Sequence, residues 1–186
     1  MTSGLEEFWE HLRQISRIAA WVLPTAGISP IVASLVGLNP PWPNRVGLTA
    51  ATSAAVLFTL VAVFQFLDAR KRRLVNRVMA LALAVGVVFA LVYFSLFGFL
   101  IYKPDGGEPF AKGFQCTVDA QLLHGDKCPW LDHDELKIAE YQETRLWTLP
   151  SIAAARISLL FAWFAMFALF SAFLGAFVRY QAIRKV

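Results

Sequence analysis

The chain alternates long apolar runs with polar connections, and four of the runs are long enough to cross a membrane as helices. A bilayer core about 30 Å thick requires about 20 helical residues at 1.5 Å each, and inside it every backbone amide has to be satisfied within its own helix. The sequence therefore predicts an all-α membrane protein built as a four-transmembrane-helix bundle. The predicted spans are Ile18–Leu38, Val46–Leu67, Val78–Ile101 and Ile157–Val178, the last extending outward through Pro150.

The remaining sequence is organised around these spans. Apolar residues at helical spacing between charged ones near the N-terminus predict an interfacial amphipathic helix, lying at the cytoplasmic surface or against a partner. Acidic residues precede the first run and no small-residue cleavage site follows it, so we expect this run to be kept as a span rather than removed as a secretory signal. The predicted segments are residues 1–17 (amphipathic helix), 18–101 (first three spans), 102–149 (external loop) and 150–186 (fourth span and basic cytoplasmic tail).

Composition supports the membrane class. The chain has 186 residues, of which 58% are hydrophobic and only 16% charged, and its mean hydropathy is +0.56. Ordinary soluble domains are about 45–50% apolar. This excess excludes a soluble enzyme, a disordered protein and a nucleic-acid-binding domain, although the sequence pI of about 9.3 would suit the last. We therefore expect no nucleic-acid partner.

The distribution of lysine and arginine predicts the orientation of the spans. Ten of the 17 basic residues fall on the side shared by both termini, six fall on the other side, and Arg156 lies at a span boundary. Acidic residues show the reverse bias, with four on the first side and nine on the other. Because cytoplasmic connections carry the basic excess, we expect both termini to be cytoplasmic, in a plasma membrane of the bacterial inner-membrane kind.

The connection between the second and third spans is the most basic part of the chain. Its cations are Arg70, Lys71, Arg72, Arg73 and Arg77. Each cation near an anionic membrane surface contributes about 1 kcal/mol of attraction, so the connection is a candidate contact for anionic lipid headgroups or a partner. We favour its simpler role as the determinant of topology.

The external loop contains both cysteines of the chain, Cys116 and Cys128. On the predicted topology they face an oxidising compartment, where a disulfide is the usual state. Closing a loop of about 13 residues stabilises the folded loop by about 3 kcal/mol in the chain-entropy model. We therefore predict a structural disulfide.

A zinc site is the alternative role of these cysteines, because His124 and His133 lie nearby in the sequence and histidine and cysteine are common zinc ligands. The spacing argues against it, since the loop has no Cys-x-x-Cys pair and the two histidines are not four residues apart. A thiol oxidoreductase is less favoured still, because such an enzyme usually needs a second cysteine pair for exchange. We expect neither a metal nor a cofactor.

The stretch from Asp132 to Trp147 predicts a helix in the second half of the loop. Asp132 and Glu135 stand at the spacing of a capping box, with aspartate at the cap. The apolar stripe of this helix is narrow, which favours a position against the membrane surface or a neighbouring subunit. We expect Trp130, Tyr141 and Trp147 to belong to an interfacial aromatic belt.

The first span contains two prolines, Pro24 and Pro30, with Gly27 between them. Each proline removes a helical hydrogen bond, so we expect a kinked or broken helix. Interrupted helices form ion or substrate sites in transporters, which makes Thr25 and Ser29 candidates for such a site. We favour a kink whose free backbone groups are satisfied by these hydroxyls and by neighbouring helices.

Arg156, just before the fourth span, is the other polar anomaly. An arginine at mid-membrane costs at least about 2.5 to 3.5 kcal/mol, but residues 157–178 cover about 33 Å without it. Arg156 is then expected at the outer boundary, where it can reach lipid phosphate or pair with an acid of the external loop. Lining a pore is its alternative role.

Small residues recur four apart in the fourth span, a pattern that lets helix backbones approach closely. Packing within the chain explains this pattern, and a contact between subunits explains it equally well. The candidate packing residues are Ala154, Ser158, Ala162, Ala168, Ala172 and Gly175.

The sequence contains no phosphate-binding glycine loop, nucleophile elbow or zinc-protease motif, so we do not expect an enzyme. We predict a non-enzymatic integral membrane subunit that forms a homo-oligomer or joins a larger complex through a membrane or cytoplasmic protein partner, in contact with the lipid bilayer. A membrane-permeabilising or channel-forming effector, for example of a bacterial anti-phage defence system, is the first alternative. A small-solute transporter is the second.

Overall fold

A computed structural model describes residues 17–67, 72–104 and 109–184 of the chain, with side chains described within residues 26–181. The predicted N-terminal amphipathic helix lies outside the described residues, and so do Arg70 and Lys71 of the basic connection.

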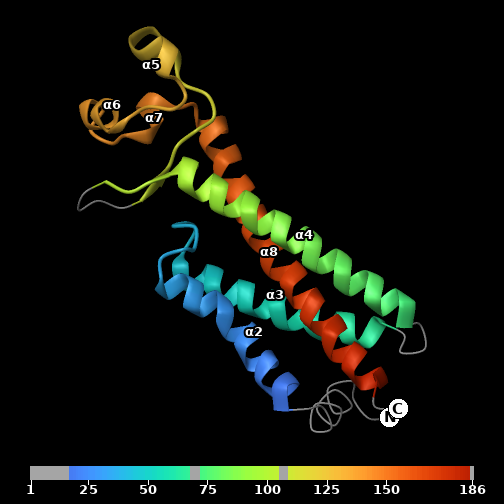
Figure 1. Cartoon of the computed structure of the whole chain (residues 1–186). Helices are drawn as coiled ribbons and strands as arrows, with labels where there is room; N and C mark the ends of the chain where they lie inside the picture. The colour runs from blue at the N-terminus through green and yellow to red at the C-terminus, as the bar shows by residue number, and fades with distance from the viewer. Residues whose placement is uncertain (1–16, 68–71, 105–108, 185–186) are drawn as a thin grey trace. The chain divides into compact units, whose positions relative to one another are not determined.

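The long helices of the described chain are α2 (Arg17–Leu35), α3 (Arg45–Phe66), α4 (Arg72–Leu100) and α8 (Leu149–Arg184), drawn in Figure 1. Three of them, α3, α4 and α8 as far as Gln181, are long and apolar enough to cross a membrane. These three confirm the predicted second, third and fourth spans as membrane-length helices. In α2, the region of the predicted first span, the described apolar stretch is Ala26–Leu35.

Apolar side chains along these helices face outward as well as inward. On α4, Leu81 is 66% exposed and Leu91 is 64% exposed, and α3 leaves Phe58 76% exposed. In water such surface would cost about 25 cal/mol for each Å². Lipid removes this cost, because hydrocarbon is as apolar as the side chains themselves.

Contacts divide the chain into two compact units. We call the first the helical unit, made of Met1–Asn39, Pro43–Ala90 and Trp163–Val186, and the second the loop unit, made of Pro40–Trp42 and Leu91–Ala162.

In the helical unit, buried aliphatic side chains hold the helices together. Ala26 of α2, Leu60 of α3 and Val178 of α8 share one cluster, while Val75 of α4 packs with Ala176 of α8 in another. The unit therefore packs α2, α3, the first part of α4 and the second half of α8 around shared contacts.

The loop unit contains the short elements of the described residues. Strands β1 (Ile101–Tyr102) and β2 (Phe110–Ala111) pair antiparallel, with Ile101 opposite Ala111. The helical elements that follow are α5 (Val118–His124), the 3-10 turn η1 (Gly125–Lys127), α6 (His133–Ile138) and α7 (Glu143–Leu146).

The prediction of a single helix between Asp132 and Trp147 is wrong, because this segment forms two separate helices, α6 and α7. Between them Glu140 and Tyr141 have φ angles of 54° and 56°, in the left-handed region that a right-handed helix cannot contain. The predicted helix start is confirmed, since Asp132 and Glu135 form a capping box before α6.

Candidate interaction site in the disulfide-closed loop

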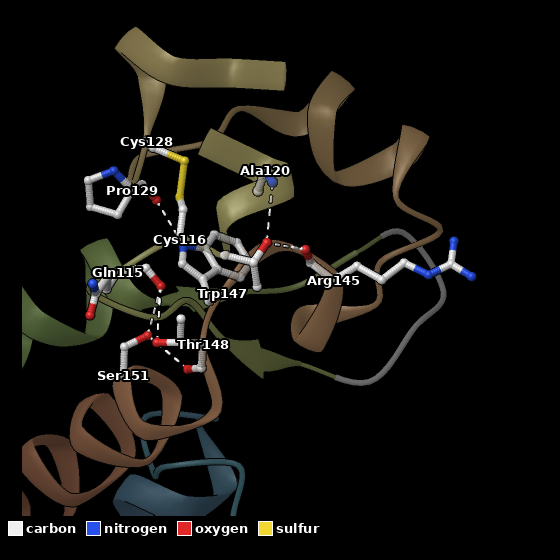
Figure 2. The surroundings of a disulfide bond; sticks show 10 residues. Gln115, Cys116, Ala120, Cys128, Pro129, Arg145, Trp147, Thr148 and Ser151 are labelled. Atoms are coloured by element: carbon white, nitrogen blue, oxygen red, sulfur yellow. Dashed lines mark hydrogen bonds between the residues drawn. A yellow bond between two sulfur atoms is a disulfide. The ribbon is translucent and has the colours of Figure 1, made fainter. Parts of the chain in front are cut away.

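Cys116 and Cys128 form the predicted disulfide, with their Cα atoms 6.2 Å apart (Figure 2). The bond joins the segment before α5 to the segment after η1. The zinc alternative requires both cysteines as thiolates, and the disulfide consumes both. The effect of the disulfide on the loop is therefore structural.

Trp147 is the centre of the loop core rather than part of an aromatic belt, which corrects the sequence-based expectation. Its side chain is 0% exposed and packs in one cluster with Cys116, Leu131 and Leu136. The indole Nε1 donates a hydrogen bond to the carbonyl oxygen of Pro129 at 3.1 Å (Figure 2). Burial is tolerated because this polar atom has a partner.

Hydrogen bonds also attach the loop to the first turn of α8. The carbonyl oxygen of Gln115 accepts from the Thr148 amide and from Ser151 Oγ, both at 3.0 Å (Figure 2). At Gly113 an added Cβ would lie 2.7 Å from Trp147 Cβ, so only glycine fits there without a shift. The loop core and the start of α8 therefore form one packed structure.

Helix α5 is fixed at its N-terminus by Thr117. The hydroxyl of Thr117 accepts from the Ala120 amide at 3.2 Å and donates to the Arg145 carbonyl oxygen at 2.8 Å. The first contact is an N-cap and the second ties the cap to α7, so the helix is held from both sides of the loop.

Within the described part of the loop, Lys127 and Glu135 form a close ion pair, with their Nζ and Oε1 atoms 2.6 Å apart. The hydrogen bond from Lys127 lowers the pKa of the Glu135 carboxyl, and the same bond raises the pKa of Lys127. The other Glu135 oxygen accepts from the Asp132 amide at 2.9 Å. One carboxylate thus caps α6 and connects it to η1.

A groove of about 540 Å³ lies between α5 and the α6–α7 segment. Its lining mixes apolar side chains with charges of both signs. It includes Asp119, Leu123, Ile138, Arg145 and Leu146.

In and beside this groove the loop exposes large apolar side chains, which we call the docking patch. The patch consists of Val118 (74% exposed), Leu122 (81%), Leu123 (78%) and Ile138 (76%). This patch was not predicted from the sequence, although the adjacent leucines of a short helix in an otherwise polar loop indicate it. An apolar cluster of this kind on a loop is typical of an interaction site.

Arg156 lies in α8 within the loop unit and has partners there. Its Nη2 donates to Glu143 Oε1 at 2.5 Å, and its guanidinium carbon lies 5.0 Å from the centroid of the Trp42 ring. Glu143, which the sequence pattern did not single out, lies in α7 of the loop unit. The pairing of Arg156 with a loop acid is therefore present.

The candidate residues of the first span lie on the continuous helix α2, which includes Pro24, Thr25 and Gly27, so of the two expected outcomes, a kink or a break, the break does not occur there. Ser29 Oγ donates to the Ala26 carbonyl oxygen at 2.8 Å. Ala26 is four residues before Pro30, so this is the carbonyl that the proline leaves without its helical donor.

The described cations of the basic connection lie at the start of α4. Arg72 donates to the Tyr180 hydroxyl at 3.2 Å, while Arg73 and Arg77 are exposed. Arg179, which the sequence analysis did not select, donates from Nε to the Leu67 carbonyl oxygen at 3.0 Å and so satisfies the end of α3.

The small residues of α8 differ in their surroundings. An added Cβ at Gly175 would lie 2.9 Å from the Leu60 carbonyl oxygen, so α3 and α8 approach closely there. Ala162 is buried, Ala168 and Ala172 are half-buried, Ser158 is half-buried with its hydroxyl bonded to the Ala154 carbonyl oxygen, and Ala154 is exposed.

These features define a multi-pass membrane protein that carries a disulfide-closed loop between its last two described membrane-length helices. No family model, curated protein or solved structure matches the chain.

Proposed function

We propose that the chain is a non-enzymatic subunit of a membrane assembly and that the docking patch of the loop contacts a protein partner, either a second copy or another chain. The observation that carries this proposal is the exposure of Leu122 and Leu123 at 81% and 78% beside the groove. Isolated exposed leucines are common on protein surfaces, whereas contiguous ones mark interaction sites.

The construction of α5 supports this role. A helix of seven residues is marginal in water by itself, yet Thr117 and the disulfide hold this one in place. Of its residues only Ala120 is buried. The Thr117 cap and the disulfide therefore stabilise a helix whose apolar face is not buried by any of the described residues.

The charges near the groove fit the same proposal. Asp119 and Arg145 line it together with apolar residues, an arrangement like the apolar centre and polar rim of protein interfaces. A partner would place apolar side chains against Leu123 and Ile138 and would pair its own charges at the edge.

The proposal includes a complete four-span architecture, in which α2 is the first crossing and both termini lie in the cytoplasm. The 19 residues of α2 reach about 28 Å at 1.5 Å each, close to the bilayer core. Reporter fusions at each terminus and in the loop test this topology. Termini on opposite faces would contradict it.

Site-specific photo-cross-linking tests the partner contact in native membranes. A photoreactive residue at position 122 should give one discrete adduct with a second copy or another protein. The matched control is Phe114, which is 41% exposed in the same loop and is not part of the docking patch. Equal adducts at both positions, or none at position 122, would contradict a docking patch.

Native mass spectrometry in detergent provides a second measurement. The double substitution Leu122→Ser and Leu123→Ser should reduce the assembly to a smaller species, because it removes the apolar centre of the contact, while Phe114→Ser should leave its size unchanged. A wild-type chain that is monomeric, with no associated protein, would be evidence against the proposal.

The same preparation separates this function from a permeabilising effector or a transporter. Reconstituted in liposomes, a structural subunit should not increase ion or solute flux. Arg156 and Ser29, which motivated the alternatives, have hydrogen-bond partners within the chain. Flux that disappears on Arg156→Gln would favour a channel.

A further inference from the structure

A second hollow lies in the helical unit, between α2 and α3. Its volume is about 400 Å³, within the range of about 300–1,000 Å³ typical of small-molecule sites. Almost all of its lining is apolar. The aliphatic lining residues are Ile31, Leu35, Val46 and Ala50.

The hollow has one cationic end. Arg45, the first residue of α3, lines it and is exposed. Among residues 17–39, 43–67, 72–90 and 163–184, which are the described part of the helical unit, the sequence has no aspartate or glutamate. Arg45 therefore has no carboxylate among the described residues of its own unit, and the N-terminal end of α3 adds partial positive charge beside it.

One polar atom in the lining is unusual. Ser53 Oγ is buried and makes no hydrogen bond among the described residues. The hydroxyl of Thr49, one turn earlier, donates to the Arg45 carbonyl oxygen at 2.7 Å, so a bond along the helix is available in this geometry. Ser53 Oγ makes no such bond, and because a buried hydroxyl without a partner is costly, an acceptor placed against it would be stabilising.

We propose that this hollow between α2 and α3 binds one glycerophospholipid. The phosphate pairs with Arg45, an ester carbonyl oxygen accepts from Ser53 Oγ, and an acyl chain lies against Ile31 and Leu35. Charge complementarity identifies the headgroup as anionic. Leu35 is 82% exposed and Val46 is 77% exposed, so the apolar rim of the hollow is open to the surrounding lipid.

This site is separate from the basic connection before α4. Arg45 and Phe66 begin and end α3, and 22 helical residues place them about 33 Å apart, which is the thickness of the bilayer core. The proposal does not depend on a protein partner of the loop. It assigns a lipid-binding site to the leaflet at the N-terminal end of α3.

Native mass spectrometry of the full chain in detergent tests the site with two probes, dioleoylphosphatidylglycerol and dioleoylglycerol, which share their acyl chains but not the phosphate. The wild-type chain should retain one phosphatidylglycerol in preference to dioleoylglycerol. Arg45→Gln should weaken its retention about fivefold, the equivalent of about 1 kcal/mol for one cation near an anionic headgroup. Arg45→Lys should restore most of it.

Ala50→Phe tests the apolar part of the hollow, because a phenyl ring at this lining position fills the hollow and should displace the lipid. Its matched control is Ala51→Phe, since Ala51 is the next residue on α3, is also exposed and does not line the hollow. Lys103→Gln, an exposed cation of the loop unit, controls for the loss of one charge. Both controls should retain the lipid as the wild type does.

Three results would overturn the proposal. Unchanged retention in Arg45→Gln, or equal retention of the two probes, would exclude phosphate recognition. Unchanged retention in Ala50→Phe would place the lipid elsewhere. Equal losses in the variants and their controls would show unspecific annular binding.

Discussion

Trp163 Nε1 donates a hydrogen bond to Thr52 Oγ1 at 2.9 Å, between α8 and α3. Thr52 is 0% exposed and Trp163 is 1% exposed, so neither side chain has water as an alternative partner. Thr52 Oγ1 in turn donates to the Leu48 carbonyl oxygen at 2.7 Å, which orients its lone pairs toward the indole. This is a polar contact between residues 111 positions apart, within membrane-length helices.

Thr52→Val should destabilise the folded chain, because valine keeps the shape of threonine but removes the hydroxyl that accepts from the buried indole N–H. Hydrogen bonds between membrane helices contribute about 0.6 to 1.7 kcal/mol, and we expect a loss in that range. Thermal unfolding in detergent measures it.

The control for this prediction is Thr49→Val. Thr49 Oγ1 bonds only to a carbonyl of its own helix in the described structure, so its loss should have little effect. A double-mutant cycle of Thr52→Val with Trp163→Phe should show that the two changes together cost less than their sum. Strict additivity would mean that the contact is energetically silent.

Gly175→Ala should destabilise the packing of α8 on α3. The added methyl would lie 2.9 Å from the Leu60 carbonyl oxygen, which is backbone and cannot rotate away. Overpacking of this kind costs about 1–3 kcal/mol. Gly98→Ala is the matched control, because nothing lies within 4 Å of the new methyl there and alanine favours a helix. Equal unfolding temperatures for the two variants would refute the close approach.

Replacing both cysteines by serine should loosen the loop while leaving the spans folded. The disulfide closes a segment with a sequence separation of 12. Loops of about this length gain about 3 kcal/mol from the crosslink in the chain-entropy model. Limited proteolysis should therefore cut the variant inside the loop at protease concentrations that leave the oxidised wild type intact. Identical digestion patterns with retained helical circular dichroism would show that the disulfide is dispensable.

The ion pair between Lys127 and Glu135 predicts a pH dependence of loop stability. Because the Lys127 hydrogen bond lowers the pKa of Glu135 in the folded loop, its stabilisation is complete above the ordinary carboxyl pKa and is lost as the pH falls through the lowered value. Loop proteolysis at pH 7 and at decreasing acidic pH measures this loss.

Lys127→Met should remove most of this acid sensitivity, since Glu135 then loses the partner that lowers its pKa. Lys137→Met controls for charge, because Lys137 is an exposed lysine of α6 for which the described structure shows no ion pair. Acid sensitivity that persists unchanged in Lys127→Met would assign the effect to other groups.

Much of this architecture was predictable because its causes are local. The lengths of the apolar runs are set by the bilayer, so α3, α4 and α8 were expected from hydropathy alone. The disulfide was expected because both cysteines of the chain lie in one loop that the predicted topology places in an oxidising compartment. The start of α6 was expected because a capping box depends on residues three apart, Asp132 and Glu135.

The positions of other side chains depend on distant contacts. The docking patch exists because the loop core buries Trp147 and leaves Leu122 exposed. Local sequence does not predict which of these two apolar side chains is buried. The predicted helix after Asp132 failed for a similar reason: the left-handed residues Glu140 and Tyr141 turn the chain so that α7 can meet the segment before α5.

By itself the sequence determined the class of protein and the approximate ends of its membrane-length helices, because length and hydropathy act through the solvent along each segment separately. Only the tertiary structure decided the partners of Arg156 and Trp163 and the shapes of the two grooves. The contact of Trp163 with Thr52, for example, joins residues 111 positions apart, and no local periodicity records that pairing.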